Sequence, residues 1–277
     1  MAQQPTRVRV PELIRRKAQG RKIAMLTAYD ATMARVFDRA GIDVLLVGDS
    51  LGTVIMGRDT TIPVTLDVMI HHTRAVTHGA RRALVVADMP FLTYQVSMEE
   101  TLRNAGRLIQ EGGAAAVKLE GGRPVVEVVR RLSDTGIPVM GHLGLTPQSI
   151  HKLGGYRTVG KSDREAAELM DDARALEQAG AFCVVLECTP AEVAEAITAE
   201  LKIPTVGIGS GPHCDGQVLV CYDAFGLFEE FTPRFVKQYA RLGEQLARAT
   251  QEYIADVQEG RFPAEEHSIS ALAQKAR

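Results

Sequence analysis

The sequence predicts an α/β protein, a (β/α)8 barrel, and three observations support this fold class. Eight short apolar runs recur along the chain, the stretches between them carry helical patterns, and the chain has 277 residues. A barrel of this kind takes roughly 250 residues as one domain, so the length suits a single barrel domain over residues 1–277. An open doubly wound sheet is the second interpretation of the same alternation.

The eight predicted strands are near-continuous runs of Val, Ile, Leu and Ala. Such runs are typical of parallel strands that are covered on both faces. The strands are expected at residues 23–27, 43–47, 84–87, 115–119, 138–141, 183–186, 205–208 and 218–221.

The helices between these strands have recognisable ends. Ser97 and Ser162 each stand three positions before a glutamate, which is the pattern of a capping box at a helix N-terminus. Gly112, Gly113 and Gly180 follow the helical patterns and suit helix C-termini, because glycine tolerates positive φ.

Two helices are expected outside the repeat. A leading helix at residues 10–19 is expected to plug or cap the barrel. A long C-terminal helix at about residues 232–257 repeats apolar side chains at Phe235, Tyr239, Leu242 and Leu246. This stripe indicates either packing on its own barrel or contacts between subunits of an oligomer. The polar residues 260–277 are expected to be a loosely held tail.

Charge and composition disfavour several classes of protein. The 32 basic and 34 acidic side chains leave a net charge of −2, which offers no attraction to nucleic acid or an anionic membrane. No apolar run approaches the roughly 20 residues of a membrane span, and the N-terminus does not resemble a secretory signal. The four cysteines show no close pairing, so we expect reduced thiols and a cytoplasmic protein.

The residues after the predicted strands carry the chemistry, because barrels place their functional side chains at the carboxyl ends of the strands. One lysine and four carboxylates follow the strands: Lys118, Asp49, Asp88, Glu120 and Glu187. Each acid alone also suits a helix cap or a turn. Together on one rim they repel each other, and a cation would relieve the repulsion. Carboxylates with water and substrate in the other positions suit Mg²⁺.

Two further features follow strands. His142, after the fifth strand, is expected either to hydrogen-bond a substrate oxygen or to hold its own loop. The glycine-rich residues 207–211 follow the seventh strand, where barrels frequently bind phosphate, but the chain has no Walker or dinucleotide-binding spacing.

Several blocks, in order, resemble the ketopantoate hydroxymethyltransferase family. The resemblance runs from about residue 23 to 222, while the N-terminal arm and the tail match less well. The blocks are residues 26–30, Val47-Gly48-Asp49-Ser50-Leu51-Gly52, Asp88-Met89-Pro90-Phe91, Val117-Lys118-Leu119-Glu120-Gly121, Gly141-His142-Leu143-Gly144-Leu145-Thr146-Pro147-Gln148, and residues 155–157, 186–187, 207–209 and 215–220.

The resemblance implies a barrel of the phosphoenolpyruvate/pyruvate type that assembles as a homodecamer and exchanges its final helix between neighbours. It also implies a reaction of pantothenate biosynthesis, in which 5,10-methylenetetrahydrofolate donates a one-carbon unit to 3-methyl-2-oxobutanoate to give 2-dehydropantoate. For the site it implies metal ligands at Asp49, Asp88 and Glu120, substrate contacts at Asp49, Ser50, Asp88 and Lys118, and a proton acceptor at Glu187.

The residue types suit this chemistry. Removing a proton beside a ketone forms an enolate, whose charge Mg²⁺ would stabilise as a Lewis acid while Glu187 acts as general base. The alternatives are another Mg²⁺-dependent lyase or mutase of 2-oxo acids with the same barrel, and a barrel that only binds. The sequence lacks the KKCGH-type loop expected of isocitrate-lyase-like members.

Overall fold

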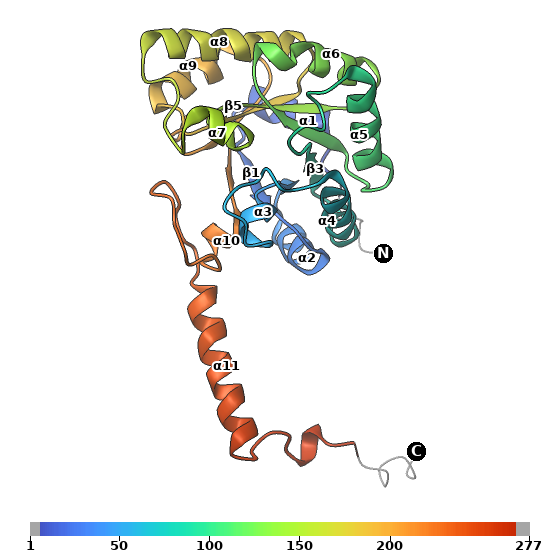
Figure 1. Cartoon of the computed structure of the whole chain (residues 1–277), viewed down its shortest axis with the longest axis vertical. Helices are drawn as coiled ribbons and strands as arrows, with labels where there is room; N and C mark the ends of the chain where they lie inside the picture. The colour runs from blue at the N-terminus through green and yellow to red at the C-terminus, as the bar shows by residue number, and fades with distance from the viewer. Residues whose placement is uncertain (1–5, 270–277) are drawn as a thin grey trace. The chain divides into compact units, whose positions relative to one another are not determined.

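A closed barrel of eight parallel strands forms the centre of the computed structural model, which describes residues 6–269 (Figure 1). Each strand pairs with the next, and the last pairs with the first. The predicted barrel is confirmed, and the open sheet is wrong because no strand of the barrel is left as an edge. The strands are β1 Ile23–Thr27, β2 Val44–Val47, β3 Leu84–Asp88, β4 Ala116–Glu120, β5 Val139–Gly144, β6 Cys183–Glu187, β7 Thr205–Ile208 and β8 Gly216–Leu219.

The eighth strand begins and ends two residues earlier than predicted. Gly216 pairs with Ile23 of β1, and a Cβ at Gly216 would lie 2.6 Å from the Ile23 carbonyl oxygen. Closure of the barrel therefore needs glycine at this point. A search for apolar runs misses it because Gly216 and Gln217 are not apolar.

Helices alternate with the strands, and two of them begin at the serines that the sequence indicates. The Ser97 and Ser162 hydroxyls accept hydrogen bonds from the backbone N–H groups of Glu100 and Glu165, which confirms both N-caps. The helices are α1 Val10–Ala18, α2 Ala31–Ala40, α3 Leu51–Val54, α4 Leu66–Gly79, α5 Met98–Gln110, α6 Val126–Asp134, α7 Ile150–Leu153, α8 Asp163–Gln178, α9 Ala191–Glu200, α10 Cys221–Ala224 and α11 Leu242–Gln258, with short 3₁₀ turns at Arg123–Val125, Pro147–Ser149 and Glu265–His267.

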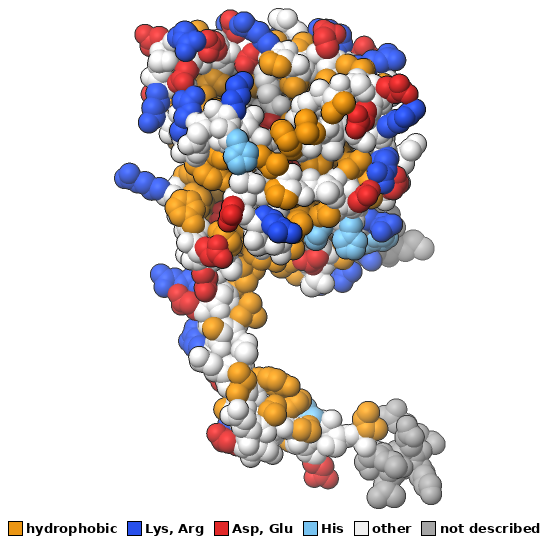
Figure 2. All heavy atoms as spheres, in the orientation of Figure 1, with side chains coloured by type: hydrophobic (Ala, Val, Ile, Leu, Met, Phe, Trp, Pro, Cys, Tyr) orange, Lys and Arg blue, Asp and Glu red, His pale blue; other side chains and the backbone are white. Residues whose placement is uncertain are grey.

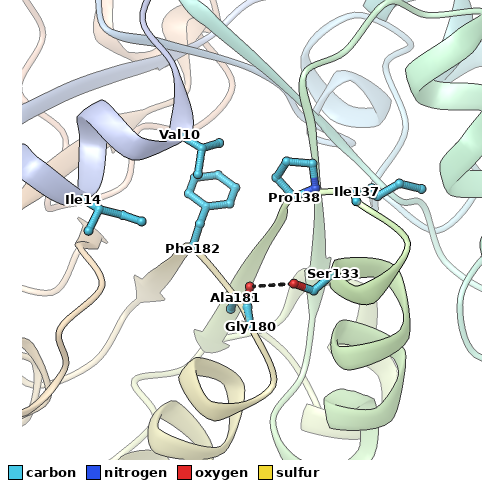
Figure 3. Close-up of a pocket in the computed structure, with 9 residues that line it drawn as sticks. Val10, Ile14, Ser133, Ile137, Pro138, Gly180, Ala181 and Phe182 are labelled. Carbon is cyan, nitrogen blue, oxygen red and sulfur yellow. Dashed lines mark hydrogen bonds between the residues drawn. The ribbon is translucent and has the colours of Figure 1, made fainter.

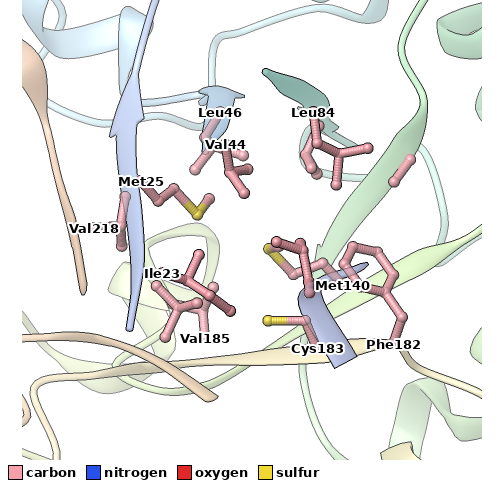
Figure 4. Close-up of a cluster of buried hydrophobic side chains, with 14 of the residues drawn as sticks. Ile23, Met25, Val44, Leu46, Leu84, Met140, Phe182, Cys183, Val185 and Val218 are labelled. Atoms are coloured by element: carbon pink, nitrogen blue, oxygen red, sulfur yellow. The ribbon is translucent and has the colours of Figure 1, made fainter. Parts of the chain in front are cut away.

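The interior of the barrel is a buried apolar cluster (Figure 4). Side chains from the strands, such as Met25, Leu84 and Val185, pack together there, and Val8 and Leu13 from the N-terminal segment belong to the same cluster. Helix α1 thus closes the amino end of the barrel, as predicted. Burying these side chains stabilises the barrel by roughly 1.5–3 kcal/mol for each large one.

The chain divides into two compact units, Met1–Cys221 with the barrel and Tyr222–Arg277. In the second unit the predicted helix at residues 232–257 is wrong in its first part, because α11 begins only at Leu242. The backbone N–H of Tyr239 instead donates to the carbonyl oxygen of Ala224, and the backbone N–H of Leu242 donates to the carbonyl oxygen of Phe225. Residues 270–277 of the predicted tail lie outside the described residues.

The next two findings, on membrane-spanning helices and on cysteines, concern residues 6–269. No helix there is long and apolar enough to cross a membrane. The four cysteines, Cys183, Cys188, Cys214 and Cys221, are all free thiols, as the sequence predicts.

Candidate active site

Polar side chains replace apolar ones at the carboxyl end of the barrel interior. Alternate residues of a strand face the same side, so Asp88 follows Val86 of β3 into the interior, and Glu187 follows Val185 of β6. By the same alternation Lys118 and Glu120 of β4 and His142 of β5 face inward. The register sets Asp88 opposite Lys118 and Glu120 opposite His142.

Asp49 and Ser50 reach this rim from the loop between β2 and α3. The backbone N–H of Asp49 donates to Oδ2 of Asp88 at 3.0 Å. The Ser50 hydroxyl lies 2.9 Å from the hydroxyl of Tyr29, which is buried. A Cβ at Gly48 would lie 2.8 Å from the Ser50 Oγ, so a larger residue there would push the Ser50 hydroxyl away from Tyr29.

Asp88 and Lys118 form a buried ion pair. The Lys118 Nζ lies 2.6 Å from Oδ1 of Asp88, and both side chains are almost fully covered. Burial alone would lower the pKa of Lys118, but the carboxylates of Asp88, Glu120 and Asp49 outweigh it and raise the pKa above its ordinary value. Lys118 is therefore a fixed positive charge at this end of the barrel.

His142 lies between two carboxylates. Its Nδ1 is 3.4 Å from Oε1 of Glu120, and its Nε2 is 3.1 Å from Oε2 of Glu187. Neither contact has good hydrogen-bond angles, so the attraction is chiefly between charges. Burial and Lys118 lower the pKa of His142, but the two carboxylates outweigh them and raise it to about 9. The ring is thus an imidazolium at neutral pH that holds these acids; it does not hold its own loop.

The charges at this rim do not balance. The four carboxylates, Asp49, Asp88, Glu120 and Glu187, face the two cationic groups of Lys118 and His142, which leaves two negative charges when all four acids are ionised. Burial first, and then Asp88 and Glu120, raise the pKa of Asp49 well above its ordinary value. A divalent cation would offset this excess, so the donor set fits Mg²⁺.

No three Asp, Glu, His or Cys side chains within residues 6–269 come close enough together to hold a cation by themselves. Magnesium sites commonly use one or two carboxylates, with water and substrate in the remaining positions. Asp49 and Asp88 suit direct ligation of this kind. Glu120 lies beside them, where its oxygens contact His142 and accept from the backbone N–H of Gln148, and it would complete the site through water.

Sequence reasoning missed two buried polar residues in this cluster. Gln148 donates from Nε2 to Oδ2 of Asp49 at 2.8 Å, and the Tyr94 hydroxyl donates to Oε1 of Gln148 at 2.7 Å. Gln148 stands in a block that resembles the family, but no local pattern indicates its contact with Asp49. Tyr94 lies in the loop after β3 and carries no signal in the sequence.

Two other features, the glycine-rich residues 207–211 and a cavity at the amino end of the barrel, carry no charged side chain. In the glycine-rich residues 207–211, the Ser210 hydroxyl donates to the Leu186 carbonyl and accepts from the Thr189 N–H, so it braces the loops. A cavity of about 300 Å³ lies where β5 and β6 begin, at the opposite end of the barrel (Figure 3). Its lining carries no charged or imidazole side chain, which rules it out as a catalytic centre.

A closed (β/α)8 barrel whose carboxyl end gathers acids, a lysine and a histidine has the arrangement of an enzyme's active site. The family model described as "Ketopantoate hydroxymethyltransferase" matches residues 7–265. The chain belongs to this family of transferases.

Named relatives agree with this assignment, and a solved structure has a similar fold. The 3-methyl-2-oxobutanoate hydroxymethyltransferase of Syntrophotalea carbinolica is 58% identical over 261 residues, covering 94% of this chain and 98% of that one. That of Syntrophus aciditrophicus is 56% identical over 253 residues, covering 91% and 93%. In fold, the chain is similar to 2,3-dimethylmalate lyase, a PEP mutase/isocitrate lyase superfamily member, with a TM-score of 0.58, 18% identity and coverage of 95% and 92%.

Proposed function

We propose that this protein transfers a hydroxymethyl group from 5,10-methylenetetrahydrofolate to 3-methyl-2-oxobutanoate and forms 2-dehydropantoate for pantothenate biosynthesis. The observation that carries the proposal is the pairing of a partly exposed carboxylate with a buried imidazolium, Glu187 with His142, beside the buried Asp88–Lys118 ion pair. The relatives at 56–58% identity support the substrate, since their names state it.

Glu187 is proposed as the general base that takes the proton from C3 of the 2-oxo acid. Its side chain is only partly covered, so a substrate can reach it. Its Oε2 lies 3.1 Å from Nε2 of His142, a contact that orients the carboxylate. A carboxylate held in this way suits the role of general base.

The remaining residues are proposed to hold the substrate's oxygens, on which negative charge develops. Lys118 supplies a fixed positive charge, and the Ser50 hydroxyl, held by Tyr29, supplies a hydrogen bond. Asp49 and Asp88, with Glu120 through water, would hold Mg²⁺, which when bound acts as a Lewis acid on the substrate's oxygens. The resulting carbon nucleophile attacks the one-carbon unit, and a carbon–carbon bond forms at C3. The two carbon–nitrogen bonds to the folate break, water supplies the hydroxyl group, and tetrahydrofolate leaves with the proton taken from C3 and one from water.

We also propose that the protein works in the cytoplasm as a homodecamer. No residue of α11 is buried in the single chain, and hydrophobic side chains are exposed along this helix (Figure 2). Leu246, Tyr253, Ile254 and Val257 follow a helical spacing and are each at least 45% exposed. A stripe of this kind suits burial against other subunits.

Proton exchange tests the proposed function. The protein is incubated with 3-methyl-2-oxobutanoate in D₂O with and without Mg²⁺, and methylenetetrahydrofolate is then added. We expect deuterium at C3 only with Mg²⁺, followed by formation of 2-dehydropantoate. Cleavage of a 2-oxo acid without the folate would indicate a lyase instead, and absence of exchange on any 2-oxo acid would indicate a binding protein.

A further inference from the structure

Gln148 occupies a central position among the buried carboxylates without being ionisable itself. It lies in the 3₁₀ turn Pro147–Ser149, which follows β5, and only 4% of its surface is exposed. Its backbone N–H donates to Oε2 of Glu120 at 3.0 Å, and its Nε2 donates to Oδ2 of Asp49 at 2.8 Å. One residue therefore holds two acids that come from different strands and loops.

The orientation of the Gln148 amide is determined by its partners. Its Nε2 also donates to the Met89 carbonyl at 2.9 Å, so both amide hydrogens face oxygens that only accept. On the other side Oε1 lies 2.7 Å from the hydroxyl of Tyr94, which is 3% exposed. A flipped amide would set Oε1 against the Asp49 carboxylate and the Met89 carbonyl and would lose both of these buried hydrogen bonds.

The Tyr94 hydroxyl is itself held in place. It lies 3.2 Å from both the N–H and the carbonyl oxygen of Glu120, at the carboxyl end of β4. The hydroxyl has one proton, and the shorter contact, to Oε1 of Gln148, takes it. The chain of hydrogen bonds therefore runs from the Glu120 backbone through Tyr94 and Gln148 to the Asp49 side chain.

We propose that Gln148, locked by Tyr94, is a positioning residue that orients the carboxylates of Asp49 and Glu120 toward a divalent cation and the substrate. The amide holds Oδ2 of Asp49 and so fixes the plane of the carboxylate that would face a cation. This inference rests on the function proposed above. Replacing a residue that orients a metal ligand commonly lowers metal affinity or activity about 10–100-fold.

Three variants test the proposal. Gln148→Met keeps the length of the side chain but removes its donors and acceptor, and Tyr94→Phe removes only the hydroxyl that locks the amide. Thr198→Val is the matched control, since it removes a buried hydroxyl that bonds Thr205 at the amino end of β7, away from the site. For each, the affinity of the metal-stripped protein for Mg²⁺ is measured by calorimetry, together with Tm, kcat and KM.

We expect Gln148→Met to weaken Mg²⁺ binding and to lower kcat, each about 10–100-fold, and Tyr94→Phe to act in the same direction by a smaller factor. Thr198→Val should lower Tm and leave Mg²⁺ affinity unchanged. Unaltered Mg²⁺ affinity and kcat in Gln148→Met would overturn the proposal. The proposal would also be overturned if Mg²⁺ affinity and kcat fell in proportion to Tm in all three variants, the control included. Gln148 would then only stabilise the fold.

A crystal structure of Gln148→Met separates this inference from the proposed function. If the unsubstituted protein binds no Mg²⁺, the metal part of the proposed function fails. The role of Gln148 can still be tested by comparing the orientation of the Asp49 carboxylate in the variant and in the unsubstituted protein. A rotated carboxylate would support positioning, and an unmoved one would refute it.

Discussion

The Nε2 atom of His142 lies 3.1 Å from Oε2 of Glu187. The two residues stand on adjacent strands of the barrel, β5 and β6, and are 45 positions apart (187 − 142) in the sequence. The same imidazolium faces Glu120 with its other nitrogen, 3.4 Å from Oε1. His142 thereby links the proposed base to the proposed metal site through one positive charge.

Replacing Glu187 by glutamine should stop the proton transfer. We expect Glu187→Gln to slow C3 exchange in D₂O by about 10²–10⁴-fold, because the amide cannot accept the proton. Binding of Mg²⁺ and of the 2-oxo acid, measured by calorimetry, should persist. Glu195→Gln, at a largely exposed position, is the control and should exchange normally. Undiminished exchange in Glu187→Gln would remove this residue as the base.

Replacing Asp88 by asparagine should weaken the metal site. The amide keeps the shape of the side chain but loses the charge that faces Lys118, so the Mg²⁺ concentration for half-maximal turnover should rise at least about 10-fold. Excess Mg²⁺ should restore turnover only in part, because Lys118 has lost its partner. A titration of turnover against Mg²⁺ measures this, and an unchanged metal requirement would contradict the ligand assignment.

The exposed stripe of α11 should carry subunit contacts. A double substitution, Leu246→Asp with Ile254→Asp, sets two charges on this stripe and should shift the protein to smaller species in light scattering. Arg248→Glu, away from the stripe on the same helix, should leave the mass unchanged. An equal mass for all three proteins would show that α11 does not hold the assembly together.

Acid should weaken an ion cluster at the amino end of the barrel. Burial would raise the pKa of Asp43, but hydrogen bonds from Arg16, the Ala24 N–H and Arg82 outweigh it and hold the pKa below its ordinary value. The ionised carboxylate therefore stabilises the fold above about pH 4, and this contribution is lost as the pH falls through the lowered pKa.

The variant Asp43→Asn tests this linkage. At pH 7 and a fixed protein concentration, its free energy of unfolding in urea should be lower by roughly 1–3 kcal/mol. The difference from the unsubstituted protein should shrink as the pH falls from about 4 through the lowered pKa of Asp43, where the carboxylate of the unsubstituted protein becomes neutral. Asp171→Asn breaks an exposed ion pair with Arg123 and should change stability by less than about 1 kcal/mol at either pH. A difference for Asp43→Asn that is independent of pH would contradict the role of its charge.

Most of the barrel could be predicted because its signals are local. The apolar runs place seven strands to within about three residues at each end, and alternation within a strand is enough to expect Asp88 and Glu187 at the carboxyl rim. The start of α11 could not be predicted in this way. Residues 232–241 have a suitable apolar spacing, but hydrogen bonds of Tyr239 and Leu242 to the distant residues Ala224 and Phe225 replace the helical ones.

The sequence by itself determined the number and order of the strands, the end of the barrel that carries the chemistry, and the acids and lysine found there. Only the tertiary structure decided which of these groups meet. His142 pairs with Glu120 and Glu187, and Gln148 reaches Asp49 across 99 positions of sequence. The physical reason is closure of the barrel, which brings together loops that are far apart in the sequence, so no local periodicity predicts their contacts. Burial then makes each of these polar contacts strong.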